Sequence, residues 1–405
     1  MGEENNFDSS ISADEKSVKF DGGLLDLIQG ADVEWKTLGE ACDTLTAPSK
    51  LTKKFYKQSG KIPIIDQGEK FIAGYTDGIY KTVSADRYII FGDHSEHIKF
   101  VDFEFIQGAD GLKILKAKPE VDAKFLYYAF KNFYQREQSY KRHWTKAKET
   151  KIPIPSLEIQ QKVVEILDKM TDYVTELTAE LTLRQKQYSY YRDQLLTFPS
   201  QSDSDESLTV RWLKMGEFGQ FIGGNGMQKK DFVESGFPAI HYGQIYTKYG
   251  LTADETFTFV SNELASKLKI ADKNDLIIAT TSENVEDILK PLAWLGGKVA
   301  IGGHESLFKH NENVKYLAYY FQTTEFQKMK QKYIVGTKVK DISKENLSNL
   351  IIPLPNLTEQ KRIVEILDKF DKLTSDLSEG LPREIELRQK QYEYWREQLL
   401  SFKKE

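Results

Sequence analysis

The sequence predicts an α+β protein: two small mixed α/β domains joined by two long antiparallel coiled-coil helices with pseudo-two-fold symmetry. Three observations support this fold class. The stretch 152–198 recurs almost residue for residue at 352–402. Each copy carries apolar side chains with a seven-residue repeat. Each copy also follows a longer, divergent stretch whose strand-like runs are bounded by turn residues.

The two copies match block by block. Val164–Lys169 reads VEILDK, as does Val364–Lys369, and Leu183–Tyr188 reads LRQKQY, as does Leu387–Tyr392. An I-P-x-P tetrapeptide opens each copy, and a weaker V-x-W echo precedes each divergent stretch. Two whole units therefore lie in tandem, with similar scaffolds carrying different globular parts. The predicted segments are an acidic N-terminal extension 1–31, a first domain 32–151, a central helix 152–198, a linker 199–209, a second domain 210–351 and a C-terminal helix 352–402.

The globular stretches read as short strands and helices, so each domain should have a small, mostly antiparallel or mixed sheet. Aromatic helices are expected at 125–134 and 316–326. The strand-like runs are rich in β-branched and aromatic residues and lie at 61–65, 87–91, 98–101, 275–279 and 298–301.

The repeated segments predict long helices. In the first copy, roughly 40 residues from Leu157 would make a rod on the order of 60 Å long. The second copy begins with Asn356 as a predicted N-cap and Glu359 three residues on. It has four extra residues near Gly380 and Pro382, which should kink or break the helix. The two helices most simply pair with one another, although pairing with another chain stays open.

Composition indicates a cytoplasmic protein. The chain has 405 residues, enough for two or three domains. Cys42 is the only cysteine, which suits a reducing cytosol. The acidic start lacks the features of a signal peptide, and no apolar run is long enough to span a membrane. The net charge of −5 neither favours nor excludes nucleic acid, so the placement of the basic residues matters more.

Basic residues interleaved with aromatic ones lie just ahead of each repeated helix. Such segments can hold phosphates and face base edges, so they predict DNA binding. The alternative is an ordinary solvated helix face, but recurrence at matched places favours nucleic acid. The candidates are Lys141, Arg142, Trp144, Lys146 and Lys148, and in the second unit Lys328, Lys330, Lys332, Lys338 and Lys340.

One helix face is too aromatic for a seam shared by two helices alone. It predicts a docking surface for a partner protein, whereas the alternative is plain coiled-coil core. Its residues are Tyr190, Tyr191, Leu195, Tyr394, Trp395 and Leu399.

Catalytic signatures are not found in the sequence. It has no G-x-x-x-x-G-K-[ST] phosphate loop, no convincing glycine-rich cofactor turn and no N-P-P or D-P-P tetrapeptide. Glu149-Thr150-Lys151 has the E-x-K form of many nucleases, and His94 with His97 could ligate a metal, but neither has supporting residues. We therefore expect a non-catalytic binder with no metal and no cofactor on this chain.

The paired I-P-x-P, VEILDK and LRQKQY blocks, each after a divergent domain, resemble the specificity (S) subunit of type I restriction-modification enzymes. The resemblance covers about 32–402. It implies two target-recognition domains, each reading one half of a split DNA site, and an antiparallel helical spacer. It also implies two methyltransferase (M) subunits with S-adenosylmethionine and two restriction (R) subunits with ATP and Mg. The near-tandem T-x-E-L element at 175–181 resembles the short central repeats of one branch of that family.

Because the two domains differ, the two half-sites should differ. Loop-borne polar groups are candidates for base contacts, since Gln and Asn pair with adenine and Lys and Arg with guanine. Loops of this composition are as often structural turns. The candidates are Gln67, Tyr75, Tyr80 and His94 in the first domain, and His241, Tyr242, Gln244, Tyr246, Thr281 and Ser282 in the second.

Two other classes of protein stay open on the sequence alone. One is a self-contained nuclease or methyltransferase with degenerate motifs. The other is a coiled-coil interaction protein that never meets nucleic acid.

Overall fold

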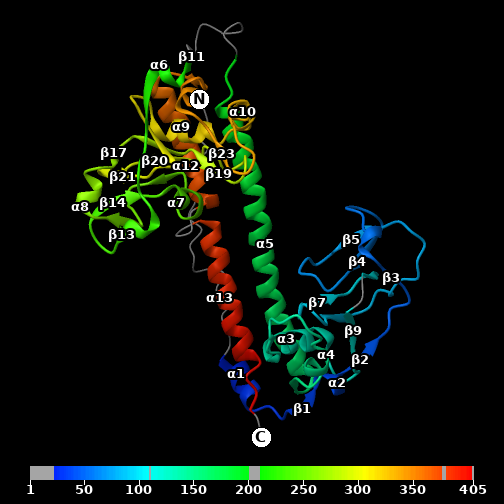
Figure 1. The fold of residues 1–405 in the computed structure, drawn as a ribbon. Helices are drawn as coiled ribbons and strands as arrows, with labels where there is room; N and C mark the ends of the chain where they lie inside the picture. The colour runs from blue at the N-terminus through cyan, green and yellow to red at the C-terminus, as the bar shows by residue number, and fades with distance from the viewer. Residues whose placement is uncertain (1–21, 109–110, 200–209, 376–379, 404–405) are drawn as a thin grey trace, which may run out of the picture. The chain divides into compact units, whose positions relative to one another are not determined.

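A computed structural model describes residues 22–108, 111–199, 210–375 and 380–403 (Figure 1). Its contacts divide the chain into two compact units, of which the first comprises 1–175 and 386–405 and the second 176–385. Each unit thus combines one globular domain with parts of both repeated segments. The acidic part of the predicted N-terminal extension, 1–17, and the predicted linker from residue 200 onward lie outside the described residues.

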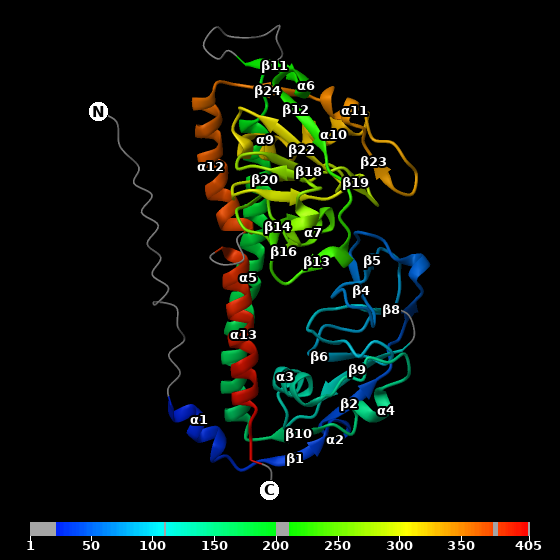
Figure 2. The same ribbon diagram turned by 60° about the vertical axis from the view of Figure 1, so that its left-hand side comes forward.

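The first globular domain holds two four-stranded sheets (Figure 2). The antiparallel sheet has the order β2-β9-β6-β7, and the mixed sheet has the order β3-β8-β4-β5 with β8 parallel to β3 and β4. Helix α3 (Ala123–Phe133) packs on the antiparallel sheet, where the rings of Phe130 and Phe91 are 5.5 Å apart. The strands are β2 Cys42–Leu45, β3 Lys50–Leu51, β4 Ile62–Ile65, β5 Gly74–Thr76, β6 Tyr88–Gly92, β7 Ile98–Val101, β8 Ile106–Gly108 and β9 Leu112–Ala117.

The second globular domain holds two five-stranded sheets, of order β12-β22-β18-β20-β15 and β13-β16-β14-β21-β17. Both are mixed, because β15 runs parallel to β20 and β14 parallel to β21. The strands are β12 Gly219–Gly223, β13 Phe232–Val233, β14 Phe237–Ile240, β15 Thr252–Ala253, β16 Thr258–Val260, β17 Lys269–Ala271, β18 Leu276–Ala279, β20 Pro291–Trp294, β21 Val299–Ile301 and β22 Glu305–His310. The prediction of one small sheet per domain is wrong in number, because each domain divides its short strands between two sheets.

The five strand-like runs in the sequence coincide, to within one residue at each end, with β4, β6, β7, β18 and β21. The predicted helix 316–326 is divided into α9 (Val314–Phe321) and α10 (Thr324–Lys330). The division occurs because the hydroxyl of Thr323 accepts the backbone N–H of Phe326 at 3.2 Å and so caps a new helix. The shorter elements are α2 Leu38–Ala41, η1 Lys53–Phe55, α4 Trp144–Ala147, α6 Met215–Phe218, η2 Lys229–Asp231, α7 Tyr242–Thr247, α8 Asn262–Ala265, β19 Thr281–Ser282, β23 Lys340–Asp341 and α11 Lys344–Ser348.

Each globular domain is closed by the same two-stranded antiparallel ribbon. In the first unit, β1 (Glu34–Thr37) pairs with β10 (Lys151–Ile154), and Trp35 lies opposite Pro153. In the second unit, β11 (Arg211–Lys214) pairs with β24 (Ile351–Leu354) in the same register, Trp212 opposite Pro353. The chain leaves each ribbon directly into a repeated helix.

A buried glutamine ties the start of each repeated helix to its domain. The side-chain oxygen of Gln160 accepts the backbone N–H of Asp122 at 2.7 Å, and its amide nitrogen donates to the carbonyl of Pro155 at 2.8 Å. Gln360 accepts the N–H of Asn313 at 3.0 Å and donates to Pro355 at 2.8 Å. Both glutamines are fully buried, so each helix leaves its domain through the same satisfied polar contact.

About two turns further along each helix, an aspartate repeats this match. Asp168 accepts from the Lys124 ammonium at 2.6 Å and from the Tyr128 hydroxyl at 2.7 Å. Asp368 accepts from Lys315 and Tyr319 at the same two distances. The two scaffolds therefore agree in their contacts as well as in their sequences.

Helix α5 (Leu157–Leu195) is 39 residues long, close to the predicted length. Within the second unit, its C-terminal half packs on α12 (Leu357–Ser375), where the ring of Tyr191 stacks on Phe370 at 5.6 Å. The Tyr188 hydroxyl also donates to the side chain of Gln322 at 3.3 Å.

Within the first unit, α13 (Leu381–Leu399) returns along the N-terminal half of α5. Arg388 lies 5.2 Å from the ring of Tyr173, and Tyr392, further along α13, is buried in the same core as Leu167. Sequence numbers rise along one helix as they fall along the other, so the two segments are antiparallel. At the end of the chain, Phe402 packs on Phe125 with ring centroids 6.5 Å apart.

The predicted break in the second repeated helix is confirmed. Helix α12 ends at Ser375 and α13 begins at Leu381, with Pro382 in its first turn, where a missing N–H costs nothing. The extra residues Ser378 and Glu379 lie outside the described residues.

The last part of the predicted N-terminal extension 1–31 is helical and contacts the first unit. Residues Gly22–Gln29 form helix α1, and Ile28 is fully buried in the core of the first unit. Of the helices that the structure describes, none is both long and apolar enough to cross a bilayer.

Candidate DNA interface

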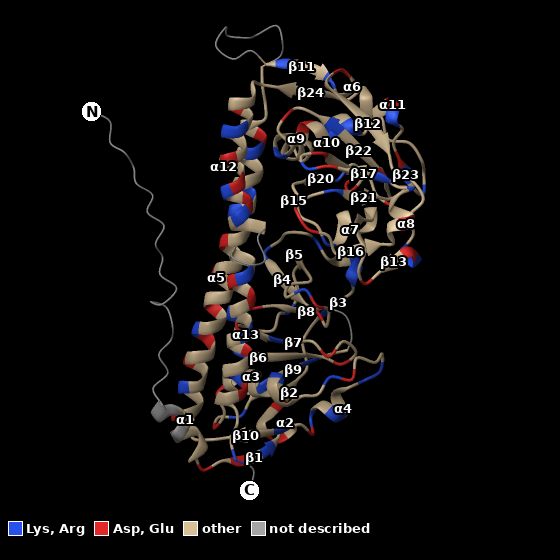
Figure 3. Cartoon of the chain, turned by 90° about the vertical axis from the view of Figure 1, so that its left-hand side faces the viewer, with Lys and Arg blue, Asp and Glu red and all other residues tan. Residues whose placement is uncertain are grey.

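The first domain presents a basic loop, 135–142, between α3 and α4. Every residue in the 135–142 loop is exposed, and Tyr140 is 93% exposed. The loop carries Arg136, Lys141 and Arg142, and α4 follows with Lys146. Figure 3 shows this run of Lys and Arg at α4. An exposed basic and aromatic loop of this kind suits phosphates and base edges.

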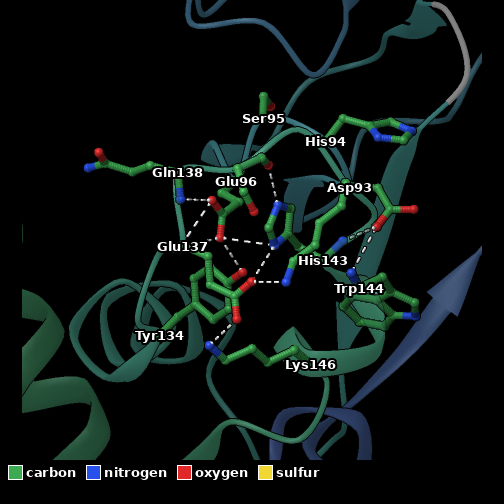
Figure 4. Close-up of polar contacts among 12 residues, drawn as sticks. Asp93, His94, Ser95, Glu96, Tyr134, Glu137, Gln138, His143, Trp144 and Lys146 are labelled. Atoms are coloured by element: carbon green, nitrogen blue, oxygen red, sulfur yellow. Dashed lines mark hydrogen bonds and ion pairs between the residues drawn. The ribbon is translucent and has the colours of Figure 1, made fainter.

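The end of the loop is held by Asp93, which begins the turn between β6 and β7 (Figure 4). One oxygen of the Asp93 carboxylate accepts the backbone N–H groups of His143 at 3.0 Å and Trp144 at 2.8 Å. The carboxylate is buried, so both bonds are shielded from water. The loop is thereby joined to the sheet at its C-terminal side.

The start of the loop is held by Glu96, which lies in the same β6–β7 connection. Glu96 accepts the Tyr134 hydroxyl at 2.7 Å and the backbone N–H groups of Glu137 at 2.9 Å and Gln138 at 2.8 Å. Burial works to raise the pKa of Glu96, but these hydrogen bonds outweigh it and the pKa lies below its ordinary value. One short connection between two strands therefore fixes both sides of the loop.

Within the loop, Glu137 gathers two of the predicted lysines. Its carboxylate lies 2.5 Å from the Lys141 ammonium and 2.6 Å from that of Lys146, and these hydrogen bonds lower the pKa of Glu137 to about 2. Arg142 is exposed and has no ion-pair partner among the described residues. A DNA phosphate could therefore bind Arg142 without displacing another group. To bind Lys141 or Lys146, it would have to compete with the Glu137 carboxylate.

His143 links the top of the loop to both carboxylates. Its Nε2 lies 2.7 Å from the carbonyl oxygen of Ser139, and its Nδ1 is 3.4 Å from Glu96 and 3.7 Å from Glu137. The imidazole is fully buried. The imidazole therefore supports the loop from inside the domain and does not reach solvent.

Two of the predicted base-contacting residues meet beside this loop. The backbone N–H of His94 donates to the side-chain oxygen of Gln67 at 3.2 Å, and the Ser95 hydroxyl donates to the Gln67 carbonyl. The His94 ring stacks on Tyr140, with centroids 5.4 Å apart and an interplanar angle of 23°. Tyr140 was visible in the sequence as an aromatic residue in a basic segment, but it was not among the predicted contacts.

The other candidates of the first domain are placed elsewhere. Tyr75 lies in β5 and bonds to Lys57 through its backbone, while Tyr80 is partly exposed after that strand. Trp144 is partly buried and packs against the core with its ring 6.0 Å from Phe91, and the prediction that it contacts DNA stays a prediction. Lys148 lies 3.8 Å from Glu149 and stays accessible.

Two candidates of the second domain cap helix α7. His241 and Gln244 are buried, and the side-chain oxygen of Gln244 accepts the N–H of His241 at 3.2 Å and the Thr258 hydroxyl at 3.0 Å. These bonds satisfy the start of the helix. These two side chains thus make bonds within the domain, and the prediction that they read bases stays a prediction.

The remaining candidates of that domain converge around His304, which the sequence analysis missed. The Tyr246 hydroxyl donates to the carbonyl of Thr281 at 2.8 Å, and the Thr281 hydroxyl lies 2.9 Å from Nδ1 of His304. The His304 ring meets Tyr242 at 4.9 Å. Ser282 follows Thr281 in β19. The turn Gly302–His304 was the only sequence signal for this exposed histidine.

The basic residues of the second unit divide into two groups. Lys330 is 1% exposed, and its ammonium donates to the carbonyls of Glu286 at 2.8 Å and Ile288 at 2.7 Å. Burial lowers the pKa of Lys330 to about 8. Lys330 holds a loop and does not face a phosphate, which corrects its predicted role. Lys340 bonds to the carbonyls of Gly336 and Thr337, whereas Lys328, Lys332 and Lys338 are exposed.

Part of the predicted docking face belongs to the core. Leu399 is fully buried, as the coiled-coil alternative predicts. Leu195 and Trp395 are partly buried and pack against the cores of their own units, and their docking role stays a prediction. Tyr190 and Tyr394 are 61% and 56% exposed, and Tyr191 is 41% exposed beside Phe370. No group of three His, Cys, Asp or Glu residues in the described ranges could hold a metal ion.

The two domains differ in their exposed loops, but each is attached to its repeated helix by the same ribbon and the same buried contacts. This arrangement defines a paired binding module. The family model "Type I restriction modification DNA specificity domain" matches residues 31–184 and 210–387. The chain belongs to this family. It is 36% identical over 400 residues to the type I restriction enzyme EcoR124I/EcoR124II specificity subunit of Escherichia coli, covering 93% of this chain and 96% of that protein. It is 29% identical over 408 residues to a putative type I restriction enzyme specificity subunit of Haemophilus influenzae, covering 93% and 97%.

Solved structures agree on the fold. The S subunit of a type I restriction-modification system from M. genitalium aligns with a TM-score of 0.56 at 17% identity, covering 93% of this chain and 98% of that one. A chain from a structure of type I restriction-modification complex assembly aligns with a TM-score of 0.58 at 18% identity, covering 91% and 98%.

Proposed function

We propose that this chain is the sequence-specific, non-catalytic DNA-binding subunit of a type I restriction-modification complex. Each globular domain reads one half of an asymmetric split site. The repeated helices set the unread spacer between the halves and dock the methyltransferase subunits. The complex works in the cytoplasm, where its DNA lies.

One observation supports this assignment above the others: the two domains are attached to their helices in the same way but expose different loops. The attachment repeats the same polar contacts at Gln160 and Gln360 and at Asp168 and Asp368. The first domain exposes Gln67, His94 and the 135–142 loop, and the second exposes the cluster around His304. Two domains that are attached alike but expose different residues suit the recognition of two different DNA sequences.

Chemistry is assigned to partners. Two methyltransferase subunits would supply S-adenosylmethionine and the methyl transfer, and two restriction subunits would supply ATP, Mg and cleavage. On this chain, the exposed Tyr190 and Tyr394 occupy matched places on α5 and α13, so each can meet one copy of the same partner.

A domain duplication tests the proposal. Residues 36–152 are replaced by 213–352, which joins the ribbons at equivalent positions because Trp35 and Trp212 lie opposite equivalent prolines. A chain with two copies of the second domain should direct methylation to a site with two identical half-sequences. The unmodified chain, mapped in the same host, should mark a site with two different halves.

The mapped methylation sites give the answer directly. An unchanged asymmetric site in the duplicated chain would show that the globular domains do not choose the bases. Methylation by the purified chain alone with S-adenosylmethionine would instead favour a self-contained enzyme.

A further inference from the structure

The 135–142 loop is unusual in being fully exposed and yet fixed from below on both sides. Asp93 holds its end, Glu96 holds its start and His143 holds its top. Glu96 and Gln138 both adopt left-handed backbone conformations, with φ of 57° and 53°. Non-glycine residues are held in that conformation only where surrounding contacts require it.

This arrangement orients one side chain above all. Tyr140 is 93% exposed, and its only ring neighbour among the described residues is His94, which belongs to the same turn as Asp93 and Glu96. His94 in turn bonds through its backbone to Gln67. Because an N–H donates to the Gln67 side-chain oxygen, the Gln67 amide nitrogen, which has no hydrogen-bond partner among the described residues, can act as a donor to a ligand.

Charge surrounds this group on the loop side. Arg142 is exposed two residues from Tyr140, and Lys141 is held in place by Glu137. An aromatic ring beside an amide donor and a guanidinium can contact a base, its sugar and the adjacent phosphate together. An ordinary solvated loop would not require the buried carboxylates of Asp93 and Glu96 to hold its two ends.

We propose that the Tyr140 ring, stacked on His94, contacts the half-site of the first domain, and that Asp93 and Glu96 are positioning residues that order the loop before DNA arrives. This inference rests on the proposed function, since it needs the first domain to read DNA. Ordering the loop in advance removes an entropic cost from binding.

The test uses the full chain in complex with its methyltransferase subunits and a duplex carrying the mapped methylation site. Competitor duplexes have one half or the other scrambled. Tyr140→Ala should weaken binding to the intact site about tenfold. It should also weaken discrimination against scrambling of one half only. Tyr140→Phe keeps the ring and should bind within about twofold of the unmodified complex.

Phe55→Ala is the matched control, because Phe55 is another exposed aromatic residue of the same domain. It should change neither affinity nor discrimination. Binding of Tyr140→Ala within about twofold of the unmodified complex, with both halves still discriminated, would overturn the assignment. Equal losses in Tyr140→Ala and Tyr140→Phe would overturn the role of the stacked ring. If the unmodified complex shows no preference for the mapped site, the proposed function fails before any variant is compared.

The positioning role has its own readout. In Glu96→Gln, hydrogen exchange at the backbone amides of Glu137 and Gln138 should accelerate about tenfold or more, because both donate to Glu96. Affinity for the intact site should fall with it, about threefold or more. Tyr134→Phe removes a single hydrogen bond from Glu96 and should produce a smaller change in the same direction.

Glu149→Gln is the control for lost charge, since Glu149 is exposed just beyond α4. Faster exchange in Glu96→Gln with unchanged affinity would remove the positioning role. Thermal unfolding of each variant separates this result from loss of the fold, and Tyr134→Phe decides the question if Glu96→Gln does not fold.

Discussion

Removal of residues 386–405 should unfold the first globular domain, although those residues end the chain and the first domain begins it. In the first unit, the end of α13 and the residues after it insert four side chains into the core, each at most 7% exposed: Tyr392, Leu399, Leu400 and Phe402. Burying one large apolar side chain contributes roughly 1.5–3 kcal/mol, so the four together contribute roughly 6–12 kcal/mol. That is comparable to the entire stability of a typical domain, about 5–15 kcal/mol.

Limited proteolysis and hydrogen exchange locate the damage. The truncated chain should lose protection in β6, β9 and α3, while β18 and α9 of the second unit keep theirs. A synthetic peptide covering 381–405, added in excess, should restore protection to the first domain. Tyr394→Ala changes an exposed side chain of the same helix and should leave protection unchanged.

Retained protection in the first domain of the truncated chain would refute the assignment of α13 to that core. Equal loss in both domains would show that the two units unfold as one, which the separate cores do not predict.

Three further predictions concern spacing, charge and docking, and a fourth concerns pH. Inserting Thr-Ala-Glu-Leu after Leu181 should lengthen α5 by about 6 Å and widen the unread spacer by one or two base pairs of about 3.4 Å each, without changing either half-site in methylation maps; altered halves would contradict it. Alanine at four basic positions should flatten the slope of log affinity against log salt by roughly one unit per lost phosphate contact. A changed sequence preference at constant slope would argue for base contacts instead. The four positions are Lys141, Arg142, Lys146 and Lys148. The double variant Tyr190→Glu, Tyr394→Glu should abolish co-purification with the methyltransferase subunit while the melting temperature stays unchanged. A complex that survives both changes would exclude these tyrosines as the docking surface. Because the pKa of Lys330 is lowered to about 8, the unfolded chain binds more protons above that pH, so the free energy of unfolding should rise between pH 8 and about 10.5. Lys330→Met should remove that rise in chemical denaturation measured across the range.

The sequence foretold the helices better than the sheets, for a physical reason. A helix of 39 residues repeats its pattern of burial many times, whereas strands such as β3 and β15 have two residues each and show no period. The duplication also placed the break at Pro382 by direct comparison of the two copies. The pairing of short strands into two sheets per domain depends on contacts between distant residues, which local patterns do not encode.

The candidate site was predicted in part for a related reason. Gln67 and His94 were both named from their loops, but their hydrogen bond across 27 positions was not foreseeable. Lys330 looks like its exposed neighbours in the sequence, because a lysine that holds a buried loop and one that meets a phosphate have the same local surroundings. Trp144 shows a similar ambiguity, since an aromatic residue in a basic segment can face either the core or the solvent, and its ring packs beside Phe91.

The helix aromatics show why a duplicated chain needs a wider apolar face than a simple coiled coil. In the first unit, the end of α13 fills space beside both α5 and the globular domain, with Phe402 on Phe125 and Tyr392 in the shared core. In the second unit, the end of α5 likewise packs against both α12 and α10. The Thr324 hydroxyl at the start of α10 donates to Asp193 of α5 at 2.5 Å. Each helix end therefore packs against a second neighbour besides its partner helix and needs more apolar positions than a two-helix seam. Much of the excess of aromatic residues is therefore internal, and Tyr190 and Tyr394 are the most exposed of the predicted docking residues.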